Sequence, residues 1–300
     1  WEAATDTNLV TAAQSQVLEC YDDAASFDDR VTLAGAITNA SYFRIIRPAS
    51  GQGHDGTPNN GVYFQSTTDL DMLALNEQYA QVQDIIGRIN INSVNHRYTF
   101  KINQPNSAFV GCIAYDSANI GTGAAHGIGL VQTTGSSYAV NCLAISIDNL
   151  GHTGSGGTHY FYNCNSVNGV TGFYSTSGTN IAKNCASSGN SSLDWDGTWT
   201  QTTCTAENAT PTYVNSAGND FHLAAADTVC KDLGTDLSAD ANYAFDDDID
   251  KAVRSGTWDI GFDEYVSTGQ TISPSGIAST EIFGTSRLDL ALALSGITSL

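Results

Sequence analysis

Tyr160-Phe-Tyr-Asn-Cys164-Asn-Ser166 is one of five copies of a phrase that recurs around a cysteine. The others are Ala108-Phe-Val-Gly-Cys112-Ile-Ala114, Ser137-Tyr-Ala-Val-Asn-Cys142-Leu-Ala144, Ile181-Ala-Lys-Asn-Cys185-Ala-Ser187 and Thr200-Gln-Thr-Thr-Cys204-Thr-Ala206. Successive cysteines are 30, 22, 21 and 19 residues apart. A period near 20 residues with strand-like composition is typical of a β-solenoid, in which each repeat forms one coil. The sequence therefore predicts an all-β fold, a right-handed parallel β-helix.

Each position of the phrase has a structural explanation. A small inward-pointing cysteine packs as a compact hydrophobe in every coil, so we expect buried thiols. Asparagine tolerates the left-handed backbone of a tight bend, and stacked amides can hydrogen-bond from coil to coil. The predicted structural ladder consists of Asn141, Asn163, Asn184, Cys112, Cys142, Cys164, Cys185 and Cys204. Cys20 and Cys230 lie outside this ladder and are expected near the ends of the solenoid.

The charge balance excludes some partners. The chain has 31 acidic and 11 basic residues, a formal net charge of −20. Such a surface repels phosphate backbones and anionic lipid, so we expect no nucleic-acid partner. No apolar run approaches the length of a membrane span, so we expect no membrane insertion.

The chain divides into three predicted regions. Residues 1–30 are expected to cap the first coil, with a helix from Asp6 to Val17. Residues 31–265 are expected to form the parallel β-helix, and residues 212–265 its acidic closing segment. Residues 266–300 read as a linker and a C-terminal strand, in which Leu288, Leu290, Leu292 and Leu294 alternate with smaller or polar residues. That strand either packs on its own solenoid or adds to an edge of the next subunit.

Catalytic groups are sparse in the central coils. Between residues 102 and 228 the only lysine or arginine is Lys183. Asp194 and Asp196 are candidates for a pair of glycosidase carboxylates, and Trp195 and Trp199 for sugar contacts. The scattered acidic residues favour a protein without an active site.

Two groups of residues are candidates for metal binding. His152, His159 and Asp148 border a Gly/Ser loop, where exposed loop histidines are the favoured interpretation. Asp246, Asp248 and Asp250 offer oxygen ligands for calcium. The favoured alternative for this acidic cluster is structural, with Arg254 paired to Asp259 or Asp263 at the end of the solenoid. No other metal or cofactor is expected.

Three sequons, at Asn39, Asn190 and Asn208, are possible sites of glycan attachment.

Two stretches resemble known families. Asn219-Asp-Phe-His-Leu223, Asp246 to Asp250, Arg254 and Trp258-Asp-Ile-Gly-Phe-Asp-Glu-Tyr265 resemble the closing segment of secreted right-handed parallel β-helix repeat proteins of the pectate-lyase-like superfamily. Ile272-Ser-Pro-Ser-Gly-Ile-Ala-Ser279 resembles a short β-repeat appended to phage and bacterial surface proteins. The resemblance implies an extracellular, cell-surface or virion-surface location, for a superfamily that includes enzymes, adhesins and fibres.

The first functional hypothesis is a non-enzymatic structural protein that assembles head to tail with itself into a filament or surface appendage. Head-to-tail contacts that do not close into a ring give an open filament. The alternatives are a β-helix domain that binds or cleaves polysaccharide and a virus tail-fibre component. Glycans are therefore the second expected partner.

Overall fold

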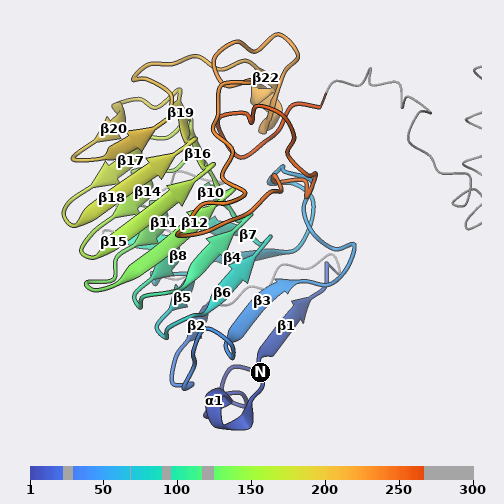
Figure 1. Cartoon of the computed structure of the whole chain (residues 1–300), viewed down its shortest axis with the longest axis vertical. Coiled ribbons are helices and arrows are strands. Elements are labelled where there is room, and N and C mark those ends of the chain that lie inside the picture. Colours follow the sequence, from blue (N-terminus) through green and yellow to red (C-terminus); the bar gives the residue numbers. More distant parts are fainter. Residues whose placement is uncertain (23–29, 68, 90–95, 117–124, 267–300) are drawn as a thin grey trace, which may run out of the picture. The chain divides into compact units, whose positions relative to one another are not determined.

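The computed structural model describes residues 1–22, 30–67, 69–89, 96–116 and 125–266. Its main body is a parallel β-solenoid with three sheets, which the chain visits in rotation (Figure 1). All strand pairs within these three sheets are parallel. The predicted parallel β-helix is thus confirmed.

The eight strands of the first sheet are, in spatial order, β1 (Gln16–Cys20), β3 (Arg44–Pro48), β6 (Gln81–Gln83), β9 (Ala108–Val110), β12 (Ser136–Val140), β15 (Thr158–Tyr162), β18 (Thr179–Lys183) and β21 (Thr200–Thr202). The six strands of the second sheet are β4 (Tyr63–Ser66), β7 (Ile86–Ile89), β10 (Ile113–Asp116), β13 (Leu143–Ile145), β16 (Asn165–Val167) and β19 (Ala186–Ser188). The seven strands of the third sheet are β2 (Val31–Leu33), β5 (Leu73–Leu75), β8 (Arg97–Ile102), β11 (Ala125–Leu130), β14 (Leu150–Gly154), β17 (Thr171–Ser175) and β20 (Leu193–Asp196).

The cysteines of the repeated phrase stack between the first and second sheets. Each thiol donates to a main-chain oxygen one coil earlier, as from Cys164 Sγ to Ala139 O (3.3 Å) and from Cys185 Sγ to Phe161 O (3.1 Å). All seven cysteines are free thiols. The main-chain hydrogen bonds place Val62 and Ile85 at the same position in two earlier coils, where the sequence shows no cysteine.

The residue before each cysteine turns the chain. Asn141, Asn163 and Asn184 all have φ of 50°, in the left-handed region that asparagine tolerates better than most residues. Gly111 and Thr203 take the same place before the first and last cysteines, with φ of 63° and 49°. A left-handed residue therefore precedes every cysteine of the ladder.

The residue two positions after each cysteine is small, and Ala144, Ser166 and Ser187 face glycines of the third sheet. A Cβ atom on Gly151 would lie 2.0 Å from Ser166 Oγ, and one on Gly172 would lie 1.9 Å from Ser187 Oγ. The two sheets approach too closely here for a larger side chain on either strand. This contact explains why the phrase keeps alanine or serine at that position.

The N-terminus differs from the prediction. Helix α1 covers only Leu9–Ala12, capped by the Asn8 side chain and ended by Ala13 in the left-handed region. Val17 belongs instead to β1, which pairs in register with β3. The helix prediction from Asp6 to Val17 is therefore wrong over most of its length, because pairing with β3 overrides the weak helical pattern. The first solenoid strand also lies within the region assigned to the cap.

The closing segment starts at the end of the solenoid but does not stay there. It contains the antiparallel hairpin of β22 (Tyr213–Asn215) and β23 (Asp220–Leu223), joined by a 3₁₀ turn (Ser216–Gly218), and then irregular chain. In Figure 1 this orange-to-red stretch runs back beside the middle coils. Phe221, Ile249 and Phe262 pack on outward-facing Ile113 and Leu143 of the second sheet. The segment thus covers a flank of the solenoid.

Residues 1–265 form one compact unit, and residues 266–300 are a separate one. The leucines at 288, 290, 292 and 294 lie outside the described residues. No described helix has the length and apolar character needed to cross a membrane.

Candidate functional site

A groove runs along the outer face of the third sheet and has a volume of about 530 Å³. Its lining comes from five successive strands, β8, β11, β14, β17 and β20, so it follows the solenoid axis. Five strands are separated by four inter-strand spacings, so the groove is about 19 Å long. The lining residues are His96, Tyr98, His126, Val131, Asn149, Leu150, Thr153, Ser155, Thr171, Tyr174, Thr176 and Asp196.

Aromatic rings occupy one end of this groove. The rings of His96 and His126 are stacked, with centroids 5.0 Å apart and an interplanar angle of 7°. Tyr98 leans against His126 at 4.8 Å, and its ring lies where a Cβ atom on Gly129 would be. The glycine therefore gives Tyr98 room to lie along the sheet. Hydroxyl and amide side chains occupy much of the rest of the lining.

His126 and Tyr98 of the groove both have pKa values shifted in the direction that favours the neutral form. Burial, reinforced by neighbouring His96, lowers the pKa of His126 to about 4. Burial raises the pKa of Tyr98 to about 12. His126 Nδ1 is buried and has no hydrogen-bond partner among the described residues. The groove thus offers uncharged hydrogen-bonding groups beside flat rings.

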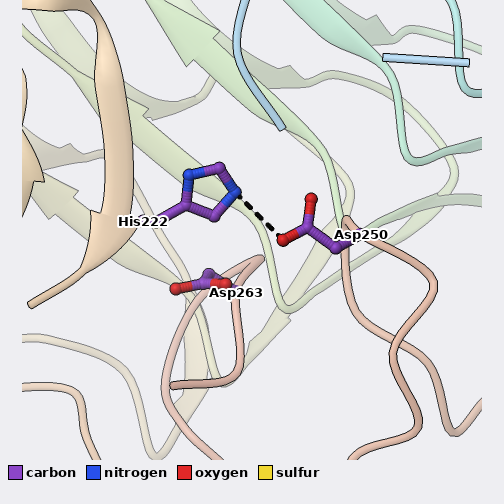
Figure 2. Close-up of side chains that lie close together, drawn as sticks. All are labelled: His222, Asp250 and Asp263. Carbon is purple, nitrogen blue, oxygen red and sulfur yellow. Dashed lines mark ion pairs between the residues drawn. The ribbon is translucent and has the colours of Figure 1, made fainter. Parts of the chain in front are cut away.

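A second cluster lies where the closing segment meets the loop of residues 51–61. Here His222 of β23 approaches two carboxylates, with Nε2 3.2 Å from Asp250 Oδ2 (Figure 2). The candidate ligand atoms of His222, Asp250 and Asp263 lie within 4.8 Å of one another. Among the described residues, this is the one group of three such side chains that is arranged to hold a metal ion.

The acidic surroundings perturb the pKa values of this cluster. Burial lowers the pKa of His222, but the hydrogen bonds to Asp250 and Asp220 and the charge of Asp263 outweigh it and raise the pKa to about 10. Burial raises the pKa of the Asp263 carboxyl to about 6. A positive charge at this position is therefore favoured.

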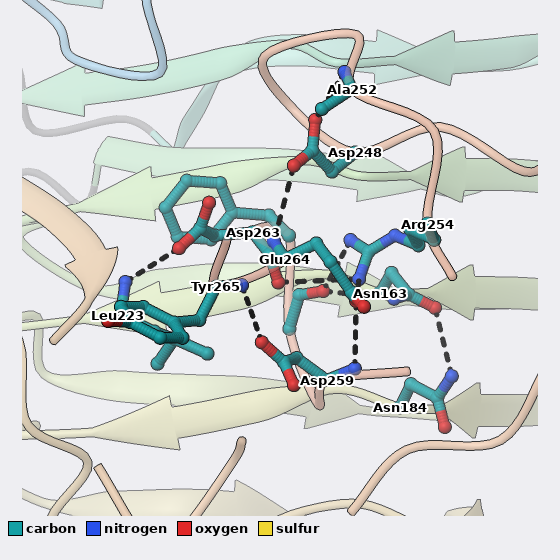
Figure 3. A network of polar contacts seen from close by, with 12 residues as sticks. Asn163, Asn184, Leu223, Asp248, Ala252, Arg254, Asp259, Asp263, Glu264 and Tyr265 are labelled. Atoms are coloured by element: carbon teal, nitrogen blue, oxygen red, sulfur yellow. Dashed lines mark hydrogen bonds and ion pairs between the residues drawn. The ribbon is translucent and has the colours of Figure 1, made fainter. Parts of the chain in front are cut away.

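Arg254 holds the closing segment together and ties it to the solenoid (Figure 3). Its buried guanidinium donates to the main-chain oxygens of Asp247, Gly261 and Asp263 and pairs with Glu264 at 3.1 Å. It also reaches Asn141 Oδ1 at 3.4 Å. The predicted partners, Asp259 and Asp263, are not its carboxylate partners, because their side chains accept main-chain N–H groups of Asp232, Leu223 and Tyr265 instead.

The chain matches no family model, no curated protein and no solved structure. The site is therefore interpreted from its own geometry.

The predicted carboxylate pair does not form. Asp194 is buried, and its carboxylate accepts from Ser187 Oγ (3.2 Å), Asn190 Nδ2 (2.7 Å) and the main-chain N–H of Asn208 (2.8 Å). Asp196, by contrast, lines the groove. Trp195 and Trp199 pack inward on Phe173, with ring centroids 4.4 and 5.7 Å away. Both tryptophans are half-buried against the core, so neither presents a free ring face there for the predicted sugar contacts.

The candidate histidine site is also not assembled. His152 and His159 are both fully buried, so the interpretation as exposed loop histidines is wrong. His152 lies between Ile128 and Phe173 in the third sheet, with its ring stacked on Phe173 at 4.7 Å. His159 lies in the first sheet, 3.1 Å from Gln132 Nε2. Asp148 does not join them in a group of three candidate ligands among the described residues.

The three aspartates proposed to bind calcium each have different surroundings and do not form one group of ligands. Asp248 is buried, and its carboxylate accepts from the main-chain N–H groups of Asp250, Ala252 and Glu264. Asp250 points to His222, and Asp246 is exposed. The sequence analysis named Asp250 as a calcium ligand and Asp263 as a partner of Arg254, but it did not predict that His222 joins them.

The three sequons differ in exposure. Asn208 is exposed. The Asn190 side chain donates hydrogen bonds to Ser187 and Asp194 and accepts one from the main-chain N–H of Gly169. The Asn39 side chain accepts from the main-chain N–H groups of Ser41 and Tyr42. Of the three, Asn208 best fits glycan attachment.

Proposed function

We propose that this chain is an extracellular β-solenoid that binds a neutral polysaccharide along the groove of its third sheet. The observation that carries the proposal is the combination of Tyr98, His126 and Tyr174 with hydroxyl and amide side chains across five strands. Sugar rings present apolar faces that pack on flat aromatic rings, while their hydroxyl groups exchange hydrogen bonds with neutral polar groups. An extended groove fits a chain better than it fits a compact ligand.

The negative charge of the protein favours neutral over acidic polysaccharides. With a net charge of −20 and Asp196 in the groove, a polyanionic chain such as a uronate polymer is disfavoured. The proposal reverses the order of the two hypotheses drawn from the sequence, because the groove supports glycan binding. It agrees with the resemblance to the pectate-lyase-like superfamily, which we retain as part of the proposal.

Affinity electrophoresis tests glycan binding directly. Gels that contain neutral glucans, mannans or galactans are expected to retard the wild-type protein, and Tyr174→Ala is expected to weaken binding about tenfold. Tyr21→Ala is the matched control, because Tyr21 is 60% exposed and lies outside the groove. Equal retardation of the two variants, or no retardation of the wild type by any neutral glycan, would contradict the proposal.

Self-assembly into a filament is the second candidate, supported by the end of the first sheet. Thr200, Gln201 and Thr202 of β21 are all exposed at one edge of this sheet, and β1 forms the other edge. Such an edge can pair with a strand of another copy. We expect Thr200→Lys with Thr202→Lys to abolish filaments in electron micrographs, because lysine side chains on an exposed strand edge oppose pairing with another strand. A wild type without filaments would refute this candidate.

The C-terminal tail gives a separate test of assembly. Removal of residues 287–300 is expected to abolish polymerisation if the alternating leucines pair with the next subunit. Normal filaments from the truncated chain would exclude the tail-exchange mechanism.

A further inference from the structure

We propose that His222, Asp250 and Asp263 bind one divalent transition-metal cation of the zinc class, which fastens the closing segment. Neither the fold nor the proposed glycan groove requires this site. The three side chains come from β23, from the turn at residues 248–251 and from the last residues of the compact unit, and they converge in Figure 2. A cation between them would link three parts of the closing segment.

The first argument is the orientation of the imidazole. Asp220 Oδ1 lies 2.6 Å from His222 Nδ1, so the proton is held on that nitrogen. The other nitrogen, Nε2, points at the two remaining carboxylates, and the cation would displace the proton that Nε2 carries in the metal-free imidazolium. Metal-binding histidines commonly have this arrangement, in which a carboxylate orients the ring from the side away from the ion.

The second argument is the space beside Nε2. A Cβ atom on Gly56, whose φ is 75°, would lie 2.2 Å from Nε2 and 3.2 Å from Asp250 Oδ1. Any side chain at this position would obstruct the face of the imidazole that points to Asp250. Only glycine allows the neighbouring loop to approach the imidazole this closely, so the loop helps to fix the position of the ring.

The third argument is that the Asp263 carboxylate is fixed by a contact of its own and that the arginine and lysine nearby have other partners. Asp263 is buried, and its Oδ2 accepts from the Leu223 main-chain N–H at 2.6 Å, which fixes the carboxylate. Arg254 donates a hydrogen bond to the main-chain oxygen of Asp263, and the neighbouring Lys251 forms an ion pair with Asp84. Arg254 and Lys251 are therefore engaged elsewhere, and once the cation replaces the His222 proton the two carboxylates remain to neutralise it.

The ligand set selects the kind of metal. One imidazole nitrogen and two carboxylates fit zinc and similar ions, whereas calcium and magnesium prefer oxygen ligands alone. Donor atoms of a tetrahedral zinc site lie about 3.3 Å apart. The observed 3.2 Å between His222 Nε2 and Asp250 Oδ2 already meets this spacing. Asp263 would complete three protein ligands, with the fourth position left to water.

Metal retention and a cobalt spectrum test the site on the intact protein. After incubation with Zn²⁺ and desalting, we expect one zinc per wild-type chain by mass spectrometry. Co²⁺ should give the intense visible absorption of a four-coordinate site. Saturating Zn²⁺ should raise Tm by about 5 °C. Ca²⁺ and Mg²⁺ are expected to produce no comparable shift.

Two variants separate metal binding from folding. Asp250→Asn changes an exposed side chain, so it should fold normally yet lose the cobalt absorption and the zinc-dependent rise in Tm. His222→Gln should lose both as well. Asp236→Asn is the control, since Asp236 lies in the same segment at an exposed position away from the cluster. No retained zinc in the wild type, full retention in Asp250→Asn and His222→Gln, or preference for Ca²⁺ would overturn the proposal.

Discussion

The amide of Asn184 donates to Asn163 Oδ1 one coil away (3.2 Å) and to the main-chain oxygen of Thr235 in the closing segment (2.7 Å). Its oxygen accepts the Thr235 main-chain N–H at 2.9 Å. The repeated asparagine therefore has two roles, because it turns the chain at each coil and also binds the segment that covers the flank. Asn141 and Asn163 reach the main-chain oxygens of Asp247 and Gly261 in the same way.

Substitution of Asn184 can separate these two roles. Asn184→Gly keeps the left-handed bend but loses the amide, whereas Asn184→Ala loses both. We expect Ala to lower the free energy of unfolding by about 3 kcal/mol, and Gly by about 1 kcal/mol less than that, since alanine is strained in the left-handed region. Urea unfolding measures the difference. Equal losses for the two variants would show that the bend contributes nothing.

Arg254 should be the most sensitive side chain of the closing segment. Arg254→Met leaves the largely buried Glu264 carboxylate without its ion-pair partner and removes one donor from each of three main-chain oxygens, and we expect a loss of about 3–5 kcal/mol. The segment should also become susceptible to limited proteolysis. Arg47→Met is the control, because Arg47 and Glu19 are each 45% exposed, and it should cost less than about 1 kcal/mol. A loss at Arg254 as small as that at Arg47 would contradict this account.

The sequence predicts the solenoid well because its fold is local and repetitive. The cysteine, the asparagine before it and the small residue two positions after it recur because successive coils meet the same neighbours. The coils of Val62 and Ile85 lack the repeated phrase, because other apolar side chains fill the cysteine position there. The fold could be predicted without them.

The sites could not be predicted in the same way, because they depend on contacts between distant residues. Asn141 and Asp247 are 106 residues apart in the chain, and no local pattern links them. The groove takes one to a few residues from each coil, so no part of it forms a motif. The prediction of an exposed loop at His152 was wrong because glycine-rich sequence is typical of loops. Here Gly151 and Gly154 instead allow close packing of β14.

The reactivity of the thiols offers a simple check of the ladder. Burial raises the pKa values of Cys112, Cys142, Cys164 and Cys185 well above the ordinary value, so these thiols should be inert in the folded protein. Cys204 is only partly buried, and a hydrogen bond from Cys185 lowers its pKa. We therefore expect a thiol-reactive dye to label Cys204 first. Cys204→Ser should abolish the fast phase of labelling, and persistence of that phase would show that another thiol is exposed.

His152 should make the stability of the solenoid depend on acid. Burial alone lowers its pKa to about 3, and its ring contacts Phe161 and Phe173. The unfolded chain binds the proton near the ordinary value of 6.5, so between about pH 6.5 and pH 3 the unfolded state holds more protons. The free energy of unfolding should then fall as the pH drops, with this residue contributing up to about 1.4 kcal/mol per pH unit.

The matched variants for this effect are His152→Phe and His152→Leu. Both remove the titrating group, so both should lessen the loss of stability between pH 6.5 and pH 4, measured by urea unfolding at several pH values. Phe keeps the stacking on Phe173 and should be at least as stable as wild type at pH 5, whereas Leu should be less stable than Phe at every pH. Buried His126 and His159 have lowered pKa values too, so some dependence on pH will remain in both variants. An unchanged slope in both variants would mean that His152 is not neutral and buried in solution.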